Sequence, residues 1–225
     1  MVAETLELKD PTSVAPSFVL QQIGFQSTTG FRSSLSRDTR DYYLDPRTGI
    51  RSAVNLDLGT PALGGTNNFY KFMVDAIKYT PLFWDTRHSI RGRFGITEGL
   101  GGKAIPLTER FYVGGINTMR GFVFGRAGPV TSDGSLLGAD QQIIINNDFI
   151  FPLSAEAKLN GVLFFDYGKG HSDVAGVSTK FRSSAGIEAR WISPFGPLRA
   201  AYGINLDREP LERKGVFEFS VGSLF

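Results

Sequence analysis

The chain of 225 residues contains no cysteine and only three methionines. The lack of cysteine excludes disulfides and thiolate metal sites, and it fits both an exported and a cytosolic protein. The sequence also lacks long hydrophobic runs: apolar stretches such as 161–165 fall far short of the roughly 20 residues that a membrane-spanning helix needs. No helical stripe of apolar residues is present either. A helical membrane anchor is therefore not expected.

An excess of charge of one sign is also lacking. The chain has 24 Lys and Arg against 22 Asp and Glu, a net charge of +2, and no basic arm, so no nucleic acid partner is expected. Residues 1–10 lack the basic and apolar regions of a signal peptide. The two histidines, His88 and His171, form no metal-binding pair, and no serine lies in an elbow motif. His171 beside Ser172 is the remaining enzymatic candidate, and we expect neither catalysis nor a cofactor or metal.

What the sequence does have is 27 glycines, 19 phenylalanines and a period of two. Apolar and polar residues alternate over most of the chain, which predicts strands with one apolar and one polar face. The last strand is the clearest case, with Phe217, Phe219, Val221 and Phe225 on one face and Glu218 and Ser220 on the other. The predicted strands cover 24–38, 50–59, 69–80, 88–98, 142–151, 156–167, 181–191, 198–207 and 217–225, with a weaker tenth at 2–9.

The direction of the faces separates two fold classes. In a soluble β-domain the apolar face points inward, whereas in a membrane barrel it meets lipid and the polar face lines the interior. The strands are long enough to cross a bilayer at a tilt. Short turns (46–49, 81–87, 152–155, 193–197) alternate with long loops (60–68, 99–139, 168–178, 207–214), as in outer-membrane barrels. We predict an all-β, antiparallel transmembrane β-barrel of nine to ten strands, with a soluble β-domain as the alternative.

The connection 99–139 is unusually long for a compact domain. Its centre, 111–122, reads Phe-Tyr-Val-Gly-Gly-Ile-Asn-Thr-Met-Arg-Gly-Phe. Glycine turns and aromatic residues around Arg120 are not typical of a disordered segment. The loop is therefore expected to dock at a defined place.

Several motifs resemble, in order, those of the BamA-like outer-membrane protein assembly factors of bacteria, mitochondria and chloroplasts. They comprise Arg-Asp-Thr-Arg-Asp at 37–41, Gly-Leu-Gly-Gly at 99–102, Phe-Tyr-Val-Gly-Gly at 111–115, Met-Arg-Gly-Phe at 119–122, Phe-Asp-Tyr-Gly at 165–168, Trp-Ile-Ser-Pro-Phe-Gly-Pro-Leu at 191–198, and the terminal Phe225. Met119 departs from the Val or Ile that is usual in the family. The resemblance covers most of the chain, and the segments at 165–168 and 191–198 are closer to the assembly branch than to the two-partner secretion branch.

The resemblance implies that 1–225 is a single barrel domain or barrel fragment, similar to the C-terminal part of a sixteen-stranded barrel and without POTRA modules. The chain would then be a truncated piece, a naturally short relative that closes into a smaller barrel, or one half that pairs with a second chain. The implied location is the outer membrane of a Gram-negative-type bacterium, as an integral protein.

In the family, the loop arginine folds into the barrel and meets acidic residues on the interior. Asp148 and Asp166 both fall on the polar face of the strands after the loop, and a guanidinium fork suits carboxylates. The expected loop latch consists of Gly114, Gly115, Arg120, Gly121, Phe122, Asp148 and Asp166. The alternative is a solvated Arg120, with the aspartates paired to Lys158 or Arg190.

The resemblance also assigns a role to the last strand. Phe217, Phe219, Val221 and Phe225 resemble the C-terminal signal by which outer-membrane barrels are recognised, although a simple lipid-facing strand would have the same pattern. The implied function is assembly and insertion of barrel proteins, with lipid, unfolded barrel proteins and other assembly subunits or a second barrel chain as partners. The alternative is a passive pore or a two-partner-secretion-type transport barrel.

Overall fold

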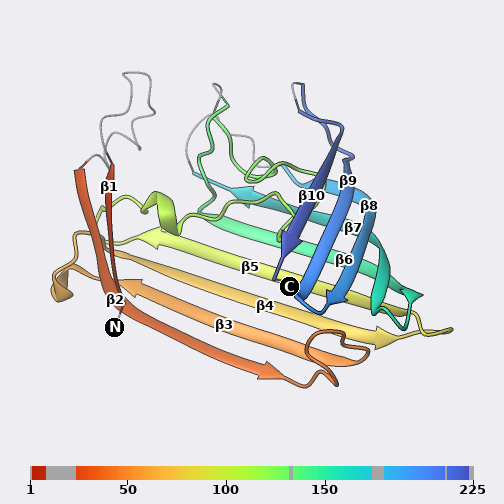
Figure 1. Cartoon of the computed structure of the whole chain (residues 1–225). Helices are drawn as coiled ribbons and strands as arrows, with labels where there is room; N and C mark the ends of the chain where they lie inside the picture. The colour runs from red at the N-terminus through yellow and green to blue at the C-terminus, as the bar shows by residue number, and fades with distance from the viewer. Residues whose placement is uncertain (1, 9–23, 132–133, 174–179, 211, 223–225) are drawn as a thin grey trace.

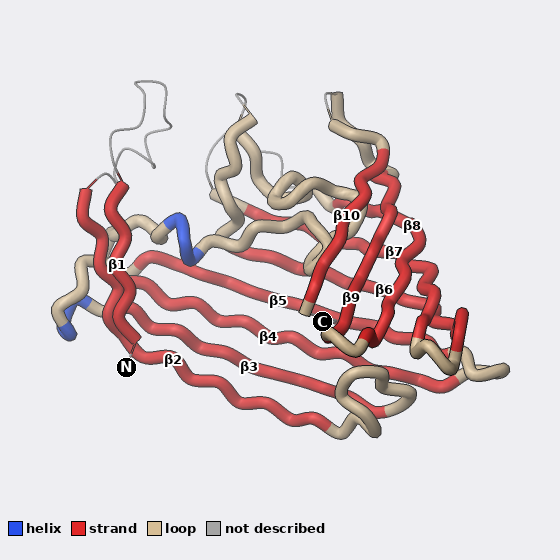
Figure 2. The backbone as a smooth tube through the Cα atoms, in the orientation of Figure 1, coloured by secondary structure: helices blue, strands red, loops and turns tan. Residues whose placement is uncertain are grey.

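The computed structural model describes residues 2–8, 24–131, 134–173, 180–210 and 212–222. They form one antiparallel sheet of ten strands in chain order, which curls so that the chain between β5 and β6 lies on its concave side (Figures 1 and 2). The strands are β1 Val2–Leu8, β2 Gly24–Asp38, β3 Gly49–Gly59, β4 Phe69–Pro81, β5 Arg87–Gly99, β6 Gln141–Ser154, β7 Leu159–His171, β8 Arg182–Ser193, β9 Gly196–Asn205 and β10 Gly215–Val221. This confirms the predicted antiparallel all-β class.

The only helices in the described part are two short 3-10 turns, η1 at Pro61–Leu63 and η2 at Leu107–Glu109. None of the helices found there is long and apolar enough to cross a membrane. Within the described residues, β1 pairs only with β2, and β10 pairs only with β9. The two outer strands of the sheet are therefore its edges.

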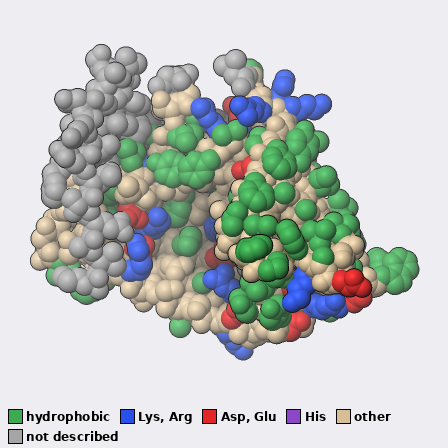
Figure 3. Space-filling view, viewed as in Figure 1, with side chains coloured by type: hydrophobic (Ala, Val, Ile, Leu, Met, Phe, Trp, Pro, Cys, Tyr) green, Lys and Arg blue, Asp and Glu red, His purple; other side chains and the backbone are tan. Residues whose placement is uncertain are grey.

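The faces of the sheet have the polarity of a membrane barrel. Large apolar side chains are exposed on the convex side, and they gather over β8 to β10 in Figure 3. On β8, Ile187 is 59% exposed while its neighbour Glu188 is 3% exposed. The outward residues include Leu35, Ile50, Val54, Phe94, Leu163, Phe165, Ile187, Trp191, Tyr202, Phe217 and Phe219. Apolar residues outside and charges inside are what lipid requires.

The interior is not uniformly polar. One buried apolar cluster lies on the inner face, formed by Ile77, Tyr79, Ile150, Val162, Phe164 and Ala201, with Ile116 of the loop packed against it. The alternation pattern did not reveal this cluster, because runs such as 162–165 are apolar on both faces. Part of the concave side is therefore filled with packed side chains.

The connections leave the two ends of the sheet in alternation (Figure 1), but their lengths agree with the prediction only in part. The connection between β2 and β3 covers 39–48, so it is longer than the predicted tight turn at 46–49 and no shorter than the predicted long loop at 60–68. Further predicted boundaries were wrong, including the starts of β9 and β10, which begin at Gly196 and Gly215 and not at 198 and 217. β6 continues to Ser154, so the turn is 155–158 and not 152–155, and Lys158 takes the left-handed conformation (φ 52°) instead of starting a strand. β7 continues to His171, so the following loop begins later than residue 168.

Candidate functional site

The chain between β5 and β6 is closed at its base and folded onto the inner face of the sheet. Phe111 and Ala139 exchange two backbone hydrogen bonds of 2.9 and 2.7 Å, which bring the ends of the central segment together. Within it, Val113, Met119, Phe122 and Ala127 are buried against Ile144 of β6. This segment is thus a packed element inside the curled sheet.

Arg120 is the centre of the contacts between this loop and the sheet. Its guanidinium donates to Asp166 from Nε (2.9 Å) and Nη2 (2.6 Å), to Asp148 from Nη2 (2.7 Å), and to Glu188 from Nη1 (2.5 Å). Its backbone N–H also donates to Asp166 (2.9 Å), and its carbonyl accepts from the hydroxyl of Ser184. The side chain is 3% exposed. Three neighbouring strands, β6, β7 and β8, therefore hold one residue.

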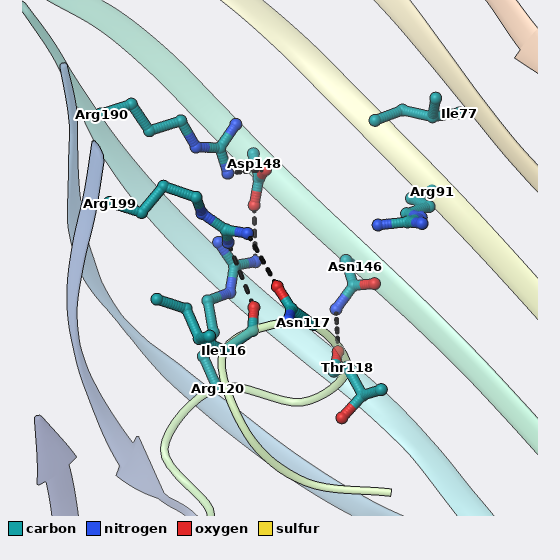
Figure 4. Close-up of a pocket in the computed structure, with 10 residues that line it drawn as sticks. All are labelled: Ile77, Arg91, Ile116, Asn117, Thr118, Arg120, Asn146, Asp148, Arg190 and Arg199. Atoms are coloured by element: carbon teal, nitrogen blue, oxygen red, sulfur yellow. Dashed lines mark hydrogen bonds and ion pairs between the residues drawn. The ribbon is translucent and has the colours of Figure 1, made fainter. Parts of the chain in front are cut away.

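Two further arginines complete the cluster (Figure 4). Arg190 donates to Asp148 (2.6 Å) and Glu188 (2.8 Å), and Arg199 donates to Glu188 (2.6 Å). We call the set of Arg120, Asp148, Asp166, Glu188, Arg190 and Arg199 the arginine cluster. Three cations face three carboxylates, so the buried charge is balanced, as buried ions require.

An aromatic ring adds to the pocket of Arg120. The guanidinium carbon lies 3.9 Å from the centre of the Phe164 ring on β7. A guanidinium over an aromatic face is attracted by the ring electrons, and the attraction grows when water is excluded. Phe164 therefore covers the face of the guanidinium, whose edges bind the carboxylates.

The glycines of the loop allow its close approach. Gly114 and Gly115 have φ values of 123° and 100°, in a turn in which Gly115 N–H donates to the Met119 carbonyl (2.9 Å). Gly121 has a φ of 83° and lies against Gly203 of β9, where a Cβ added to Gly203 would come within 2.5 Å of the Gly121 Cα. Backbone therefore packs on backbone at this point, which only glycine permits.

Phe122, which follows Gly121, is buried beside Arg182 of β8. Its side chain is 2% exposed, and the Arg182 guanidinium lies 5.0 Å from its ring centre. Arg182 also pairs with Glu212 in the loop between β9 and β10. Burial acts to raise the pKa of Glu212, but hydrogen bonds from Arg182 and from the Glu209 backbone N–H hold it below its usual value.

The motif at 37–41 spans the end of β2 and the start of the following turn. The carboxylate of Asp41 accepts backbone hydrogen bonds from Arg47 (2.9 Å), Tyr42 (3.0 Å) and Thr48 (3.2 Å). Burial alone would raise the pKa of Asp41, and these N–H donors bring it below its usual value. The motif therefore orders a turn at the end of the sheet opposite the long loops.

The structure brings Arg120, Asp148 and Asp166 together, with Gly121 and Phe122 beside them and Gly114 and Gly115 in the adjoining turn. It also joins Arg190 to Asp148, whereas Lys158 lies in the 155–158 turn. Phe217, Phe219 and Val221 are exposed on the outer face of β10. Phe225 lies outside the described residues.

Glu188 and Arg199 were not among the predicted site residues. Alternation had placed both on the polar face, and that parity is the only signal in the sequence that could have found them. Parity gives the face of a residue but not its depth in the interior relative to residues on neighbouring strands. The depth depends on how neighbouring strands are staggered, which the register supplies: Asp166 lies opposite Ser184, and Glu188 lies opposite Ala201.

The remaining enzymatic candidate, His171 beside Ser172, is not arranged for catalysis. The Ser172 hydroxyl donates to Asp140 (3.1 Å), and His171 Nε2 lies 3.0 Å from Asp173. Ser172 itself is 3% exposed. Over the described ranges, no group of His, Asp and Glu side chains could hold a metal ion.

Comparison with known proteins connects this geometry to a family. The model of the Omp85 superfamily domain matches residues 4–225. The outer membrane protein assembly factor BamA of Nitratidesulfovibrio vulgaris is 31% identical over 97% of this chain and 28% of its own length. BamA of Neisseria meningitidis is 26% identical over 89% of this chain and 29% of its own. The chain thus spans less than a third of these relatives.

Solved structures resemble this fold as well. BamA from Haemophilus ducreyi lacking POTRA domains 1–3 has a TM-score of 0.72 at 21% identity, over 87% of this chain and 42% of that one. CdiB from Acinetobacter baumannii has a TM-score of 0.60 at 17% identity, over 88% of this chain and 34% of that one. At these identities the likeness shows the fold alone.

Proposed function

Because this chain belongs to the Omp85 superfamily, we propose that it is the barrel part of an outer-membrane protein assembly factor, which helps barrel proteins to fold and insert. The observation that carries the proposal is the match to curated assembly factors over nearly the whole chain. The chain is an integral outer-membrane protein, and its exposed apolar face meets lipid. Unfolded barrel proteins are the proposed substrates, and other assembly subunits or a second barrel chain are the proposed partners.

Residues 1–225 would form one barrel unit with the loop at 99–139 folded inside. We assign the arginine cluster the role of a latch, which holds this loop in the lumen while the rest of the barrel changes shape. The support is the number of bonds that converge on Arg120 from β6, β7 and β8. Gly114, Gly115, Gly121 and Phe122 would shape the loop so that Arg120 can reach the carboxylates.

The proposed recognition strand is β10. It is an edge of the sheet in the described part, and Phe217, Phe219 and Val221 are all more than half exposed. An edge strand presents unpaired backbone groups, onto which an extended segment of another chain can add. We propose that β10 offers such pairing to an incoming barrel strand and that no covalent catalysis is involved.

The test compares insertion with conductance in the same proteoliposomes. The chain is reconstituted, an unfolded outer-membrane barrel is added, and its folding is followed by the shift in gel mobility of the unheated sample. We expect faster folding than in empty liposomes, and slower folding with Arg120→Ala than with Arg126→Ala, which removes an exposed arginine of the same loop.

The second candidate function is a passive pore or secretion barrel, which the likeness to CdiB favours. It predicts steady ion conductance in these samples and no acceleration of folding. That outcome would reject the assembly function and support the alternative.

A further inference from the structure

The tip of the lumenal loop lies against the last two strands. The backbone N–H of Ile116 donates to Glu218 Oε1 on β10 (2.8 Å), and the Ile116 carbonyl accepts from Arg199 Nη2 on β9 (3.2 Å). Figure 4 shows Arg199 reaching the loop at Ile116 and Asn117. One peptide segment is therefore bonded to both strands, and its side chain packs on the inner apolar cluster.

Among the described residues, Glu218 is the only β10 residue whose side chain forms a hydrogen bond to the interior. β10 has seven residues and pairs only with β9 there. The side chains of Phe217, Phe219 and Val221 point outward, and no other β10 side chain in the described ranges makes a hydrogen bond. An edge strand this short is prone to fray. The Glu218 bond is therefore well placed to control how easily it does so.

The surroundings of Glu218 are shaped for this contact. A Cβ added to Gly115 would lie 3.4 Å from Glu218 Oε1, at a backbone φ of 100° that side chains rarely adopt. The other carboxylate oxygen, Oε2, is buried and has no partner among the described residues. A hydrogen bond to a carboxylate is stronger than a neutral one, but an unsatisfied buried oxygen costs free energy. The unsatisfied oxygen therefore offsets part of the stabilisation that the bond to Ile116 provides.

We propose that Glu218 is a positioning residue, a clasp that couples the arginine cluster to the terminal strand. The coupling runs from Glu218 to Ile116, from Ile116 to Arg199, and from Arg199 through Glu188 to Arg120. Displacement of Arg120 loosens the loop tip, removes the partner of Glu218 and frees β10. The role rests on the proposed function, because it makes the position of the loop decide whether β10 is ordered for pairing with a substrate strand.

The clasp is tested by hydrogen exchange of the β10 amides in the full chain in lipid nanodiscs. Glu218→Ala should speed this exchange about tenfold, the effect of losing one hydrogen bond to a charged group. Glu218→Gln keeps an acceptor oxygen and should stay close to the wild type. Ser220→Ala, an inward neighbour on the same strand, is the matched control and should change nothing. Unchanged exchange in Glu218→Ala, or equal loss in Glu218→Gln, would overturn the clasp.

The coupling has its own test. Arg120→Ala should speed β10 exchange in the wild-type background and add nothing when Glu218 is already alanine, because the same tie is lost in both. Additive effects would overturn the coupling. If exchange behaves as expected but insertion of barrel proteins is not accelerated, the proposed function fails and the clasp stands. If insertion is accelerated and exchange is unchanged, the clasp fails alone.

Discussion

Replacing Arg120 by alanine removes the centre of the arginine cluster. The substitution deletes hydrogen bonds to Asp166, Asp148 and Glu188, and it leaves two arginines facing three buried carboxylates. Breaking a buried ion pair from one side costs about 3 to 5 kcal/mol, chiefly because a charge is left uncompensated. The backbone bond from Arg120 to Asp166 survives, so we expect the lower end, about 3 kcal/mol. That shifts the docking equilibrium of the loop roughly 150-fold toward the open form.

Chymotrypsin cleavage of the folded protein measures this equilibrium. Phe111 and Phe122 are 5% and 2% exposed, so cleavage after them requires the loop to open. The rate at these two sites should rise by about two orders of magnitude in Arg120→Ala, provided that opening is faster than cleavage. Mass spectrometry separates these cuts from cleavage after Phe124, which is already 62% exposed.

Two variants make the result interpretable. Arg126→Ala removes an exposed arginine from the same loop and should leave cleavage after Phe111 and Phe122 unchanged. Arg120→Lys keeps the charge but lacks the planar fork that serves three carboxylates, so it should fall between wild type and alanine. Equal cleavage rates in wild type and Arg120→Ala would refute the view that Arg120 holds the loop.

Two further predictions concern the packing of Gly121 on Gly203 and the ion pair between Glu212 and Arg182. Gly203→Ala places a Cβ 2.5 Å from the Gly121 backbone, so it should destabilise the folded chain by about 1 to 3 kcal/mol in urea unfolding, whereas Gly92→Ala, with nothing within 4 Å, should not. Glu212 has a pKa below its unfolded-state value of 4.5. Its ion pair with Arg182 therefore stabilises the folded loop above pH 4.5, and this stabilisation is lost as the pH falls below that value. Hydrogen exchange in the loop between β9 and β10 should therefore speed up below that pH relative to Glu212→Gln, and identical pH profiles would contradict this.

The sequence predicted the sheet well because its signal is local. Alternation reports the face of each residue, and lipid on one side makes that alternation strict. The bounds of β2, predicted at 24–38, agree with the structure. The error at 155–158 has the same origin: Ala157 and Leu159 continue the alternation in phase, although Lys158 turns the chain. A period of two therefore cannot locate a turn that preserves the phase.

The arginine cluster could be predicted only in part, because its geometry is not local. Asp148 and Asp166 are found from parity and from the resemblance, and parity also puts Glu188 inside. The distance between Arg120 and Glu188 depends on the stagger of β6, β7 and β8, which no short window of sequence contains. The proximity of Ile116 to Glu218, 102 positions apart, depends in addition on the path of the whole loop.

The loop is held in two physically different ways, and the difference bears on what Arg120 does. Val113, Met119, Phe122 and Ala127 bury apolar surface against the sheet, and this attraction has no preferred direction. The arginine cluster adds little net stability over apolar packing of the same volume. The planar guanidinium of Arg120, however, can donate to three carboxylates in only one arrangement. Apolar contacts therefore attract the loop to the wall without fixing its position, and Arg120 selects and stabilises the one docked position. On this view, the loop of Arg120→Ala opens more often, and when it contacts the lumen wall it visits several positions, in most of which Ile116 no longer meets Glu218.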